Sequence, residues 1–426
     1  PDRVTTFADR LNIPIGVTPI PGGVLAYSIP ELYRFPDADG DGKADGKEVA
    51  YREFGYGDTH GMSSSLHWWI DGWVYGCHGY ANTSTVQGSD DQAITMNSGN
   101  TYRLRPDGSH IEYYTHGQVN PFGMSIDPLG NVYTSDCHSR PIYMLVRGAY
   151  YPSFGKPHDG LGFGPEMMQH SHGSTGIAGV VYYSADQFPE SYRGTAFVLN
   201  PVTGRVNHDV LEPHGSTYKA IERPDFIRCD DPWFRPVDMQ IGPDGSLYIA
   251  DFYNAIIGHY EVPLDHPLRD KTRGRIWRVT YVGSEGASAR SPAPDLTRMP
   301  ADELVAALGH PNLTVRTHAT HQLVHRVGPS AVEAVRAMLS GRSSPEQRAH
   351  GVWVLFRLGA LDPPTLETLA RDDDRLVRVH AVKALAERTA WGPFERGLAF
   401  EGLIDADPFV QRAAAEAAGR HPHVDN

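Results

Sequence analysis

The chain has 426 residues, enough for two domains with hydrophobic cores of their own. Its 38 Lys and Arg residues against 51 Asp and Glu residues give a formal net charge of −13, which argues against nucleic acid and anionic membranes as partners. No apolar stretch approaches the ~20 residues of a transmembrane helix, and the 3 cysteines are too few for a disulfide framework. Because the sequence starts at Pro1 without a signal-like segment, we expect a processed or excised piece of a longer chain.

Residues from about 10 to 280 predict a β-propeller. Short β-branched and aromatic runs alternate there with Gly, Pro, Asn and Asp, and several runs flank tight turns typical of β-hairpins. The turns include Asp71-Gly72, Leu129-Gly130 and Asp244-Gly245. Their blade-sized spacing favours a propeller over the alternative, a β-sandwich. Five units are visible, with a closing strand at Arg275–Val279, and the predicted domain covers residues 1–280.

An acidic loop near the start of this domain has the spacing of a calcium-binding loop. The pattern D-x-D-x-D-G-x-x-D-x-x-E lets alternate carboxylates converge on one hard cation, while Gly42 permits the sharp bend. The predicted ligands are Asp37, Asp39, Asp41, Lys43 through its carbonyl, Asp45 and Glu48. The alternative is an acidic surface turn, and in either case the expected role is structural.

Polar clusters flank the hairpins of the predicted blades. Since the loops of successive blades open toward one face of a propeller, we expect these clusters to surround a central pocket. The candidate binding residues are Asn120, His78, His138, His172, Asp238 and Asn254. Imidazole and thiolate groups suit Zn, Cu or Fe, so Cys77 and Cys137 with the nearby histidines predict a transition-metal or haem site. The alternative is that both cysteines are simply buried.

Residues 281–297 are rich in Ser, Ala, Gly and Pro and are predicted to be a linker. After it, residues 298–426 carry Leu, Val, Ala, Glu and Arg at helical spacing. A capping residue or Pro followed by Arg and small residues recurs at 312–316, 344–348, 374–378 and 407–412. Such repeats predict a HEAT-like α-solenoid, a fold that usually presents surface to partners.

Three segments carry a resemblance to a known family. They are residues 233–239 (Trp-Phe-Arg-Pro-Val-Asp-Met), 242–254 (Gly-Pro-Asp-Gly-Ser-Leu-Tyr-Ile-Ala-Asp-Phe-Tyr-Asn) and 273–279 (Arg-Gly-Arg-Ile-Trp-Arg-Val). Together they resemble the planctomycete-type membrane-bound dehydrogenases, which join a sorbosone/glucose-dehydrogenase-like propeller to HEAT repeats and often to a cytochrome c domain. The resemblance implies a six-bladed propeller whose first blade is missing or incomplete here, and a periplasmic or otherwise extracytoplasmic location. The Cys-x-x-Cys-His motif of covalent haem does not occur in the sequence.

The resemblance also implies roles for individual residues. Quinoprotein sugar dehydrogenases use as general base a His that precedes an Asp-Gly turn by about ten residues. Here His60 precedes Asp71-Gly72 at nearly that spacing and is the candidate base, whereas His67 is expected to pack within the fold. Arg235 and Asp251 are the other catalytic candidates, orienting substrate or cofactor. The family's Arg before the equivalent of Asn120 is Val119 here, which puts pyrroloquinoline quinone in doubt because Val cannot bind a carboxylate.

These observations predict an extracytoplasmic oxidoreductase. It would oxidise a sugar, small polyol or related alcohol or aldehyde and pass electrons to a cytochrome c docked on the solenoid. Two alternatives remain open: a non-redox, metal-assisted carbohydrate lyase or hydrolase, and a propeller–solenoid scaffold that only binds partners. The lyase or hydrolase would act without an electron acceptor, and the scaffold would be indifferent to substitution of His60.

Overall fold

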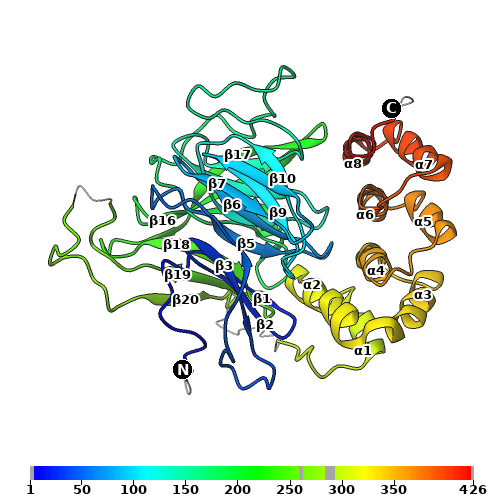
Figure 1. Cartoon of the computed structure of the whole chain (residues 1–426), viewed down its shortest axis with the longest axis horizontal. Coiled ribbons are helices and arrows are strands. Elements are labelled where there is room, and N and C mark those ends of the chain that lie inside the picture. Colours follow the sequence, from blue (N-terminus) through cyan, green and yellow to red (C-terminus); the bar gives the residue numbers. More distant parts are fainter. Residues whose placement is uncertain (1–3, 259–261, 284–292, 424–426) are drawn as a thin grey trace.

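The computed structural model describes residues 4–258, 262–283 and 293–423. Strands fill the chain from Val17 to Val279, and helices follow from Ala301 to Arg420 (Figure 1). Of the predicted linker, residues 284–292 lie outside the described part of the chain. None of the helices in the described ranges combines the length and hydrophobicity that a membrane-spanning helix needs.

Five antiparallel sheets make up the first part of the molecule, and each is built from strands that are mostly consecutive in the chain. The first two sheets contain β1 (Val17–Ile20), β2 (Gly23–Ser28), β3 (Glu31–Pro36) and β4 (Glu48–Tyr51), then β5 (Ser64–Trp68), β6 (Val74–His78), β9 (Asn100–Leu104) and β10 (Ile111–His116). The third contains β11 (Asn120–Ile126), β12 (Val132–Cys137) and β13 (Ile142–Leu145). The last two contain β14 (Val180–Tyr182), β15 (Thr195–Asn200), β16 (Arg205–His214) and β17 (Thr217–Arg228), then β18 (Pro236–Ile241), β19 (Leu247–Asp251) and β20 (Arg275–Val279). A separate hairpin, β7 (Thr83–Gln87) and β8 (Ala93–Asn97), is inserted in the second sheet.

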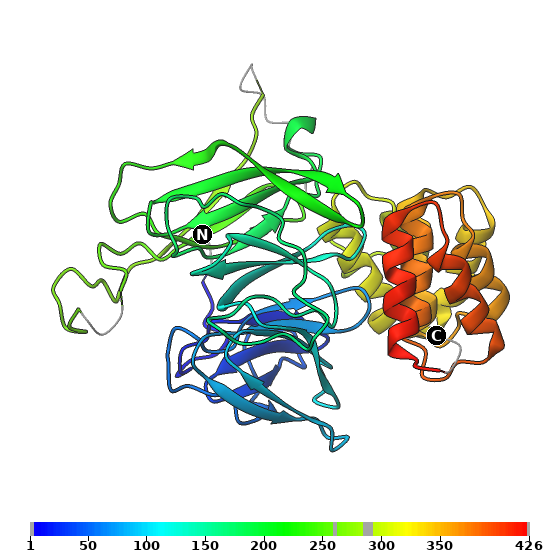
Figure 2. The ribbon, with the colours of Figure 1, turned by 90° about the horizontal axis from the view of Figure 1, so that it is seen from above.

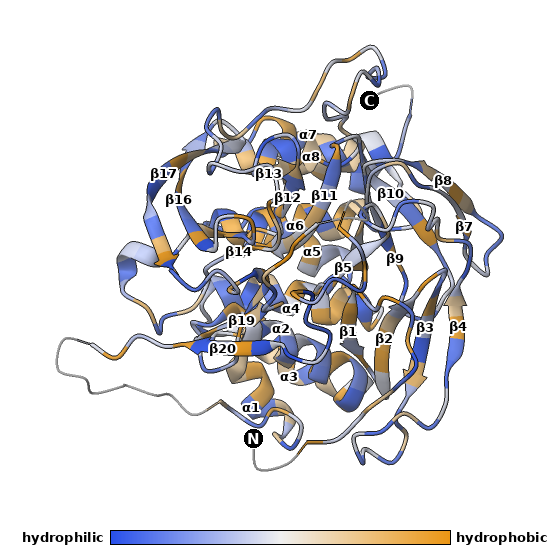
Figure 3. Ribbon diagram, turned by 90° about the vertical axis from the view of Figure 1, so that its left-hand side faces the viewer, coloured by the Kyte–Doolittle hydropathy of each residue, from blue (hydrophilic) through white to orange (hydrophobic). Residues whose placement is uncertain are grey.

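The sheets are arranged around a centre, as the predicted propeller requires (Figure 3). Their first strands, β1, β5, β11, β14 and β18, lie innermost, and neighbours in this order contact each other from β1 to β18. The closing strand predicted at Arg275–Val279 is confirmed as β20. The described residues form five such sheets, so the six-bladed count stays a prediction.

The register of each sheet divides the propeller into two faces. Ser64 pairs with Cys77, Asn120 with Cys137 and Pro236 with Asp251, so the innermost strands begin where the second strands end. We call this the loop face. The turns that join the first two strands of each sheet lie on the opposite face, which we call the turn face. Gly72, in one of these turns, has a φ of +86°, and a side chain there would meet Arg357.

Eight helices form the second part of the described chain, and four of their caps were predicted. The helices are α1 (Ala301–Ala307), α2 (Leu313–Gln322), α3 (Val332–Ser340), α4 (Pro345–Arg357), α5 (Pro363–Ala370), α6 (Arg375–Ala386), α7 (Pro393–Leu403) and α8 (Pro408–Arg420). The side chains of Asn312, Ser344, Asp374 and Asp407 each accept a backbone N–H of the first turn. A π-helical turn, Leu323–Val327, continues α2.

Helices α2, α4, α6 and α8 stand in a row against the turn face, with the odd-numbered helices outside them (Figures 1 and 2). Each helix of the row holds the turn of a different sheet. Asn312, which caps α2, donates to Gly242 O at 2.8 Å, and Arg357 of α4 donates to Ile70 O at 3.3 Å. His380 of α6 contacts Pro128 O at 2.7 Å, while Arg412 of α8 donates to Ser216 O. The inner surface of the helical region is therefore occupied by the propeller itself.

A shared core and a buried ion-pair network fasten the two parts together. One hydrophobic cluster contains Trp73 and Tyr75 of the propeller together with Trp353 and Leu385 of the helices. Beside it, Glu387 Oε1 lies 2.7 Å from Arg103 Nη2, and the side chains are only 7% and 2% exposed. Arg147 and Arg420 also reach Glu387, at 3.2 and 3.7 Å. The propeller and the helices thus fold against each other as one body.

Candidate active site

The loop face holds most of the predicted site residues, but their side chains are largely engaged in holding the blades. Asn120 donates to His60 O at 3.1 Å and accepts from Tyr80 N at 3.0 Å. Its own backbone N–H donates to Asp136 Oδ1 at 2.6 Å. Burial raises the pKa of Asp136 to about 7. Asn120 therefore links the second and third sheets.

Arg235, Asp251 and Asn254 form a similar junction between the fourth and fifth sheets. Asp251 accepts from the backbone N–H groups of Arg235 and Tyr253, both at 2.8 Å, and from Trp277 Nε1 at 2.9 Å. The Arg235 guanidinium donates to four main-chain carbonyls, those of Pro201, Val202, Asn254 and Ala255. Buried Asn254 donates to Asp270 O at 2.8 Å. Through these hydrogen bonds, the three residues hold the fourth and fifth sheets together. Their predicted roles in binding and catalysis stay predictions.

The histidines of the loop face differ in their surroundings. His78 is fully buried, contacts Ser98 O at 2.8 Å and Ser84 Oγ at 2.7 Å, and burial lowers its pKa to about 4. His138 is exposed, in the left-handed region with φ of +74°. It lines an open depression of about 610 Å³ with Val119, Phe154 and Lys156. His60 is one-third exposed, and its Nδ1 lies 3.0 Å from Asp58 Oδ1.

The two cysteines predicted to share a metal or haem site do not come together. Cys77 Sγ lies 4.0 Å from Gly123 O in the core, whereas Cys137 Sγ lies 2.9 Å from Ile177 O. Burial raises the pKa of both thiols, that of Cys137 to about 12, which disfavours the thiolate that a metal would need. Neither cysteine belongs to a group of three or more possible ligands within the described residues. The prediction that Cys77 and Cys137 share one metal site is therefore wrong.

The acidic loop between β3 and β4 gathers three of its six predicted ligands. Carboxylate oxygens of Asp37, Asp39 and Asp41 lie within 4.8 Å of one another. Each also accepts a backbone N–H of the loop, from Gly42, Asp41 and Lys43 respectively, and Asp37 Oδ1 is buried without a partner. This donor set fits a hard cation. Two predicted ligands are engaged elsewhere: Asp45 accepts from Ala38 N at 2.7 Å, and Glu48 lies 3.9 Å from Arg34.

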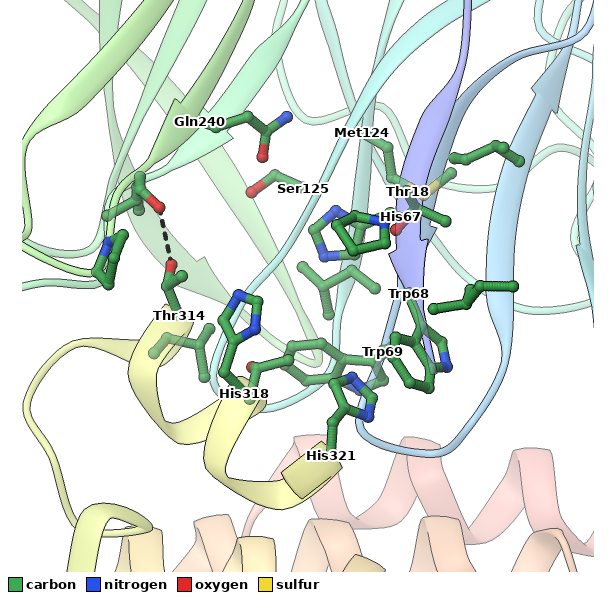
Figure 4. A pocket seen from close by; sticks show the side chains of 18 of the residues that line it. Thr18, His67, Trp68, Trp69, Met124, Ser125, Gln240, Thr314, His318 and His321 are labelled. Atoms are coloured by element: carbon green, nitrogen blue, oxygen red, sulfur yellow. Dashed lines mark hydrogen bonds between the residues drawn. The ribbon is translucent and has the colours of Figure 1, made fainter. Parts of the chain in front are cut away.

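A cavity of about 820 Å³ lies on the turn face, between the propeller and helix α2. Its propeller side is made by β1, β5, β11, β14 and β18, and its other side by α2 and the π-helical turn after it. Figure 4 shows His67 and Trp68 on the propeller side, and His318 and His321 on α2. A smaller space of about 290 Å³ between the innermost strands shares His67 and Asp238 with this cavity.

The imidazoles of the cavity are neutral at physiological pH. Burial lowers the pKa of His67 to about 4 and also lowers that of His318. Arg357 donates to His321 Nδ1 at 3.0 Å and to His325 Nε2 at 2.6 Å. Burial and this guanidinium keep the pKa of His321 well below its usual value and that of His325 near 4.

Apart from its histidines, the cavity lining contains one carboxyl group, that of Asp238, and one guanidinium, that of Arg326. Asp238 is open to the cavity but surrounded by protein, and this desolvation raises its pKa. Gln240 Nε2 lies 3.3 Å from Asp238 Oδ2. Arg326 is the single basic side chain other than His among the lining residues in the described part of the chain, and it donates to the carbonyls of Leu296 and Met299.

The sequence predicted a pocket among the loops of the loop face, whereas this cavity lies on the turn face. Of the predicted site residues, only Asp238 lines the large cavity. His67, which we expected to pack, is part of its wall. The available signal was the run of histidines at 318, 321 and 325, spaced by three and four residues and therefore on one helical face. Nothing in that run indicates that this face closes the propeller.

Comparisons with known proteins give a family and a set of distant structural likenesses. A glucose dehydrogenase is 18% identical with a TM-score of 0.41, over 55% of this chain and 72% of that one. The aldose sugar dehydrogenase of Streptomyces coelicolor, solved with bound PQQ, is 16% identical with a TM-score of 0.38, over 65% and 96%. Virginiamycin B lyase of Staphylococcus aureus is 10% identical with a TM-score of 0.33, over 57% and 78%.

With TM-scores below 0.5, these three likenesses carry no conclusion about function. No curated protein sequence matches the chain. The sequence model described as "Domain of unknown function (DUF7133)" matches residues 1–283, the whole propeller. The match spans well over half of the chain, and the protein belongs to this family.

Proposed function

We propose that this protein is an extracytoplasmic oxidoreductase that oxidises a sugar or a related alcohol or aldehyde and passes the electrons to a cytochrome c. The main support for a small-molecule substrate is the cavity of about 820 Å³ between the propeller and α2. Its volume lies within the roughly 300–1,000 Å³ of small-molecule sites. The oxidative chemistry and the location outside the cytoplasm rest on the resemblance of the strand motifs to sorbosone/glucose-dehydrogenase-like propellers.

The lining suits a neutral, polyhydroxylated molecule. Neutral imidazoles can both donate and accept hydrogen bonds, as can the hydroxyls of Thr18, Ser125, Thr314 and Thr317. Indole rings of Trp68 and Trp69 offer apolar surface for the C–H face of a sugar ring. An anionic ligand would find one guanidinium, already bound to carbonyls, and a carboxyl group.

Oxidation of a hydroxyl-bearing carbon to a carbonyl removes two protons and two electrons. Because each cytochrome c haem accepts one electron, two haems are reduced for each substrate molecule. The first proton to leave is that of the hydroxyl group, which needs a base. Two imidazoles can take the proton. His67 lies in the cavity wall, whereas His60 is held by Asp58 on the loop face, where the carboxylate orients the ring. His67 is therefore a second candidate for the general base, and it lies on the face opposite to the predicted base, His60.

Pyrroloquinoline quinone does not match the donors on either face. A quinone with several carboxylates needs cationic partners, and Val119 stands where the resemblance expects an Arg. Lys156 is the single Lys or Arg lining the depression beside His138 in the described residues, and its ammonium donates to Asn97 O. We therefore assign no step to this cofactor. The electron acceptor that we propose is a cytochrome c.

The helical region and the acidic loop take supporting parts in this proposal. We assign the repeated helices to a HEAT-like solenoid, whose outer row (α1, α3, α5 and α7) is the surface left for a cytochrome c, since the inner row packs on the propeller. The acidic loop would hold Ca²⁺ through Asp37, Asp39 and Asp41 and so fix the edge strand β4. That ion would be structural.

The test is reduction of an artificial electron acceptor by the full chain in the presence of aldoses and polyols. We expect saturable turnover that falls at least about 100-fold in either His67→Ala or His60→Ala, because loss of a general base costs roughly 10²–10⁴-fold. The variant that loses activity shows which face of the propeller binds the substrate. The matched control is His116→Ala, because His116 is also a half-buried histidine but is not a candidate for the base. Turnover without an acceptor, or none with any sugar, would overturn the proposal.

A further inference from the structure

A second group of ligand-type side chains lies away from the cavity, beside the third and fourth sheets. His170 and His172 belong to the connection between β13 and β14, and Asp209 lies within β16. The connection is anchored on both sides of this pair: Ala220 N donates to Met167 O at 2.9 Å, and Asn200 Nδ2 donates to His172 O at 3.0 Å. The two imidazoles are therefore presented to Asp209 by a fixed backbone.

Both rings direct Nε2 at the same carboxylate. His170 Nε2 lies 2.8 Å from Asp209 Oδ1, and His172 Nε2 lies 2.8 Å from Asp209 Oδ2. The ring planes meet at 74°, and one ligand atom from each residue lies within 4.8 Å of the others. Asp209 is fully buried and the His172 side chain is 1% exposed, whereas the His170 side chain is 23% exposed. The group is thus closed on the protein side and open toward solvent at His170.

Two carboxyl groups on neighbouring strands face His172. Asp209 pairs directly with Glu222 across β16 and β17, and like charges at such a position destabilise a sheet. His172 lies between them, with Nε2 toward Asp209 and Nδ1 at 3.4 Å from Glu222 Oε1. A neutral imidazole carries one N–H, so one of its nitrogens would turn a lone pair toward a carboxylate.

Two arrangements remove this conflict. In one, His172 is an imidazolium. In the other, Nδ1–H faces Glu222 and the Nε2 lone pair binds a metal ion shared with His170 and Asp209. Metal-bound histidines commonly carry such an outer carboxylate, which fixes the tautomer. His172 Nδ1 is buried and makes no well-formed hydrogen bond, whereas Nε2 lies 2.8 Å from Asp209 Oδ2.

We propose that His170, His172 and Asp209 bind a divalent first-row transition-metal ion, with Glu222 orienting His172. Two imidazole nitrogens and a carboxylate suit Zn²⁺, Fe²⁺ or Cu²⁺ rather than Ca²⁺ or Mg²⁺, which prefer oxygen ligands. Three protein ligands leave coordination positions for water or another molecule. The partial exposure of His170 provides a path to them.

The test uses the untagged full chain, stripped of metal with a chelator and dialysed. Zn²⁺ binding is measured by titration calorimetry, and Co²⁺ binding by its visible absorption. We expect one tight site that Zn²⁺ and Co²⁺ share, in addition to any weak binding at the acidic loop. His170→Ala and Asp209→Asn should each weaken Zn²⁺ binding more than 100-fold, and Glu222→Gln by about 10- to 100-fold.

Matched variants separate this site from the others. His110→Ala removes a histidine that is paired with a carboxylate, Asp90, but has no second imidazole partner, and Asp39→Asn removes a ligand of the acidic loop. Both should keep the tight site. If Asp209→Asn fails to fold, the His170→Ala variant keeps the test informative, because the His170 side chain is partly exposed. Absence of a tight site, or equal Zn²⁺ affinity in wild type and His170→Ala, would overturn the proposal and leave an imidazolium between two carboxylates.

Discussion

Trp68 of strand β5 lies stacked on His321 of helix α2, with ring centroids 3.6 Å apart and an interplanar angle of 11°. The stack joins residues about 250 positions apart and closes one side of the cavity. Arg357 fixes the imidazole through Nδ1 and lies over the indole with its guanidinium carbon 5.7 Å from the ring centroid. These contacts hold Trp68 and His321 together in the wall of the cavity.

Removal of the indole should weaken both the wall and ligand binding. Trp68→Ala is expected to cost stacking energy of about 0.5–1.5 kcal/mol in addition to the buried area, and to lower sugar affinity. Trp68→Phe keeps an aromatic face and serves as the control. Denaturant unfolding gives the stability, and titration calorimetry gives the affinity. A Trp68→Ala protein that binds sugar as wild type does would place the substrate elsewhere.

The buried network around Glu387 makes the contact between propeller and helices sensitive to one charge. Glu387→Gln leaves Arg103 with Glu112 and without its second close carboxylate. We expect a loss of roughly 3 kcal/mol of unfolding free energy, at the lower end for a broken buried pair.

The matched control is Glu401→Gln. Glu401 pairs with Arg371 at 2.8 Å, but both side chains are 52% exposed, and solvent-exposed pairs contribute little. Urea denaturation of both variants, followed by circular dichroism, provides the comparison. Equal midpoints for the two variants would contradict the role given to Glu387.

Acid should destabilise the protein well above the pKa of its carboxylates. Burial lowers the pKa of His67, His78 and His380 to about 4 from 6.5. Between these pH values the unfolded chain binds protons that the folded protein does not, so stability is full above about pH 6.5 and falls as the pH drops toward 4.

The substitution His380→Gln tests the contribution of one buried histidine to this pH dependence of stability. His380 Nδ1 accepts from Trp353 Nε1 at 2.8 Å, and Nε2 donates to Pro128 O at 2.7 Å, so the ring is neutral when folded. The variant should be less stable at neutral pH but show a flatter loss of stability between about pH 7 and 5. Thermal melts at several pH values measure the slope. An unchanged slope would mean that His380 does not contribute to it.

Calcium should stabilise the first sheet through the acidic loop. At a free concentration of about one hundred times the Kd, a bound ion adds about 2.7 kcal/mol to the unfolding free energy. Chelation should therefore lower the melting temperature of wild type. Asp39→Asn should abolish this difference. Asp107→Asn, in the turn between β9 and β10 where Asp107 accepts from Ser109 N, should keep it. A melting temperature that ignores chelator would show that the loop is only a surface turn.

The sequence was informative wherever structure is local. Hairpin turns such as Asp71-Gly72, the caps Ser344 and Asp407 and the last strand at Arg275–Val279 depend on neighbours within a few residues, and each is present. The choice of face was not local. Loops with His, Asp and Arg suggested a binding site, yet residues such as Arg235 and Asp251 satisfy main-chain groups that the blades leave without partners.

The cavity could not have been derived in the same way. It exists because α2 crosses the turn face, and that crossing depends on contacts such as Asn312 with Gly242 and Leu313 with Ser184. Pairs so distant in sequence leave no periodic pattern. The metal group shows the same limit: His170 and His172 are neighbours in the chain, but their carboxylate comes from a strand 37 residues beyond His172.

The placement of α2 as a roof over the centre of the propeller has a consequence for how such a protein can diversify. Side chains of one short helix line one side of the cavity, and the innermost strands of the propeller line the other. Replacements at 314, 317 or 318 would reshape the chamber without disturbing any ladder of strands. Selectivity for different ligands can thus change in one part of the molecule while the architecture of the other is inherited intact.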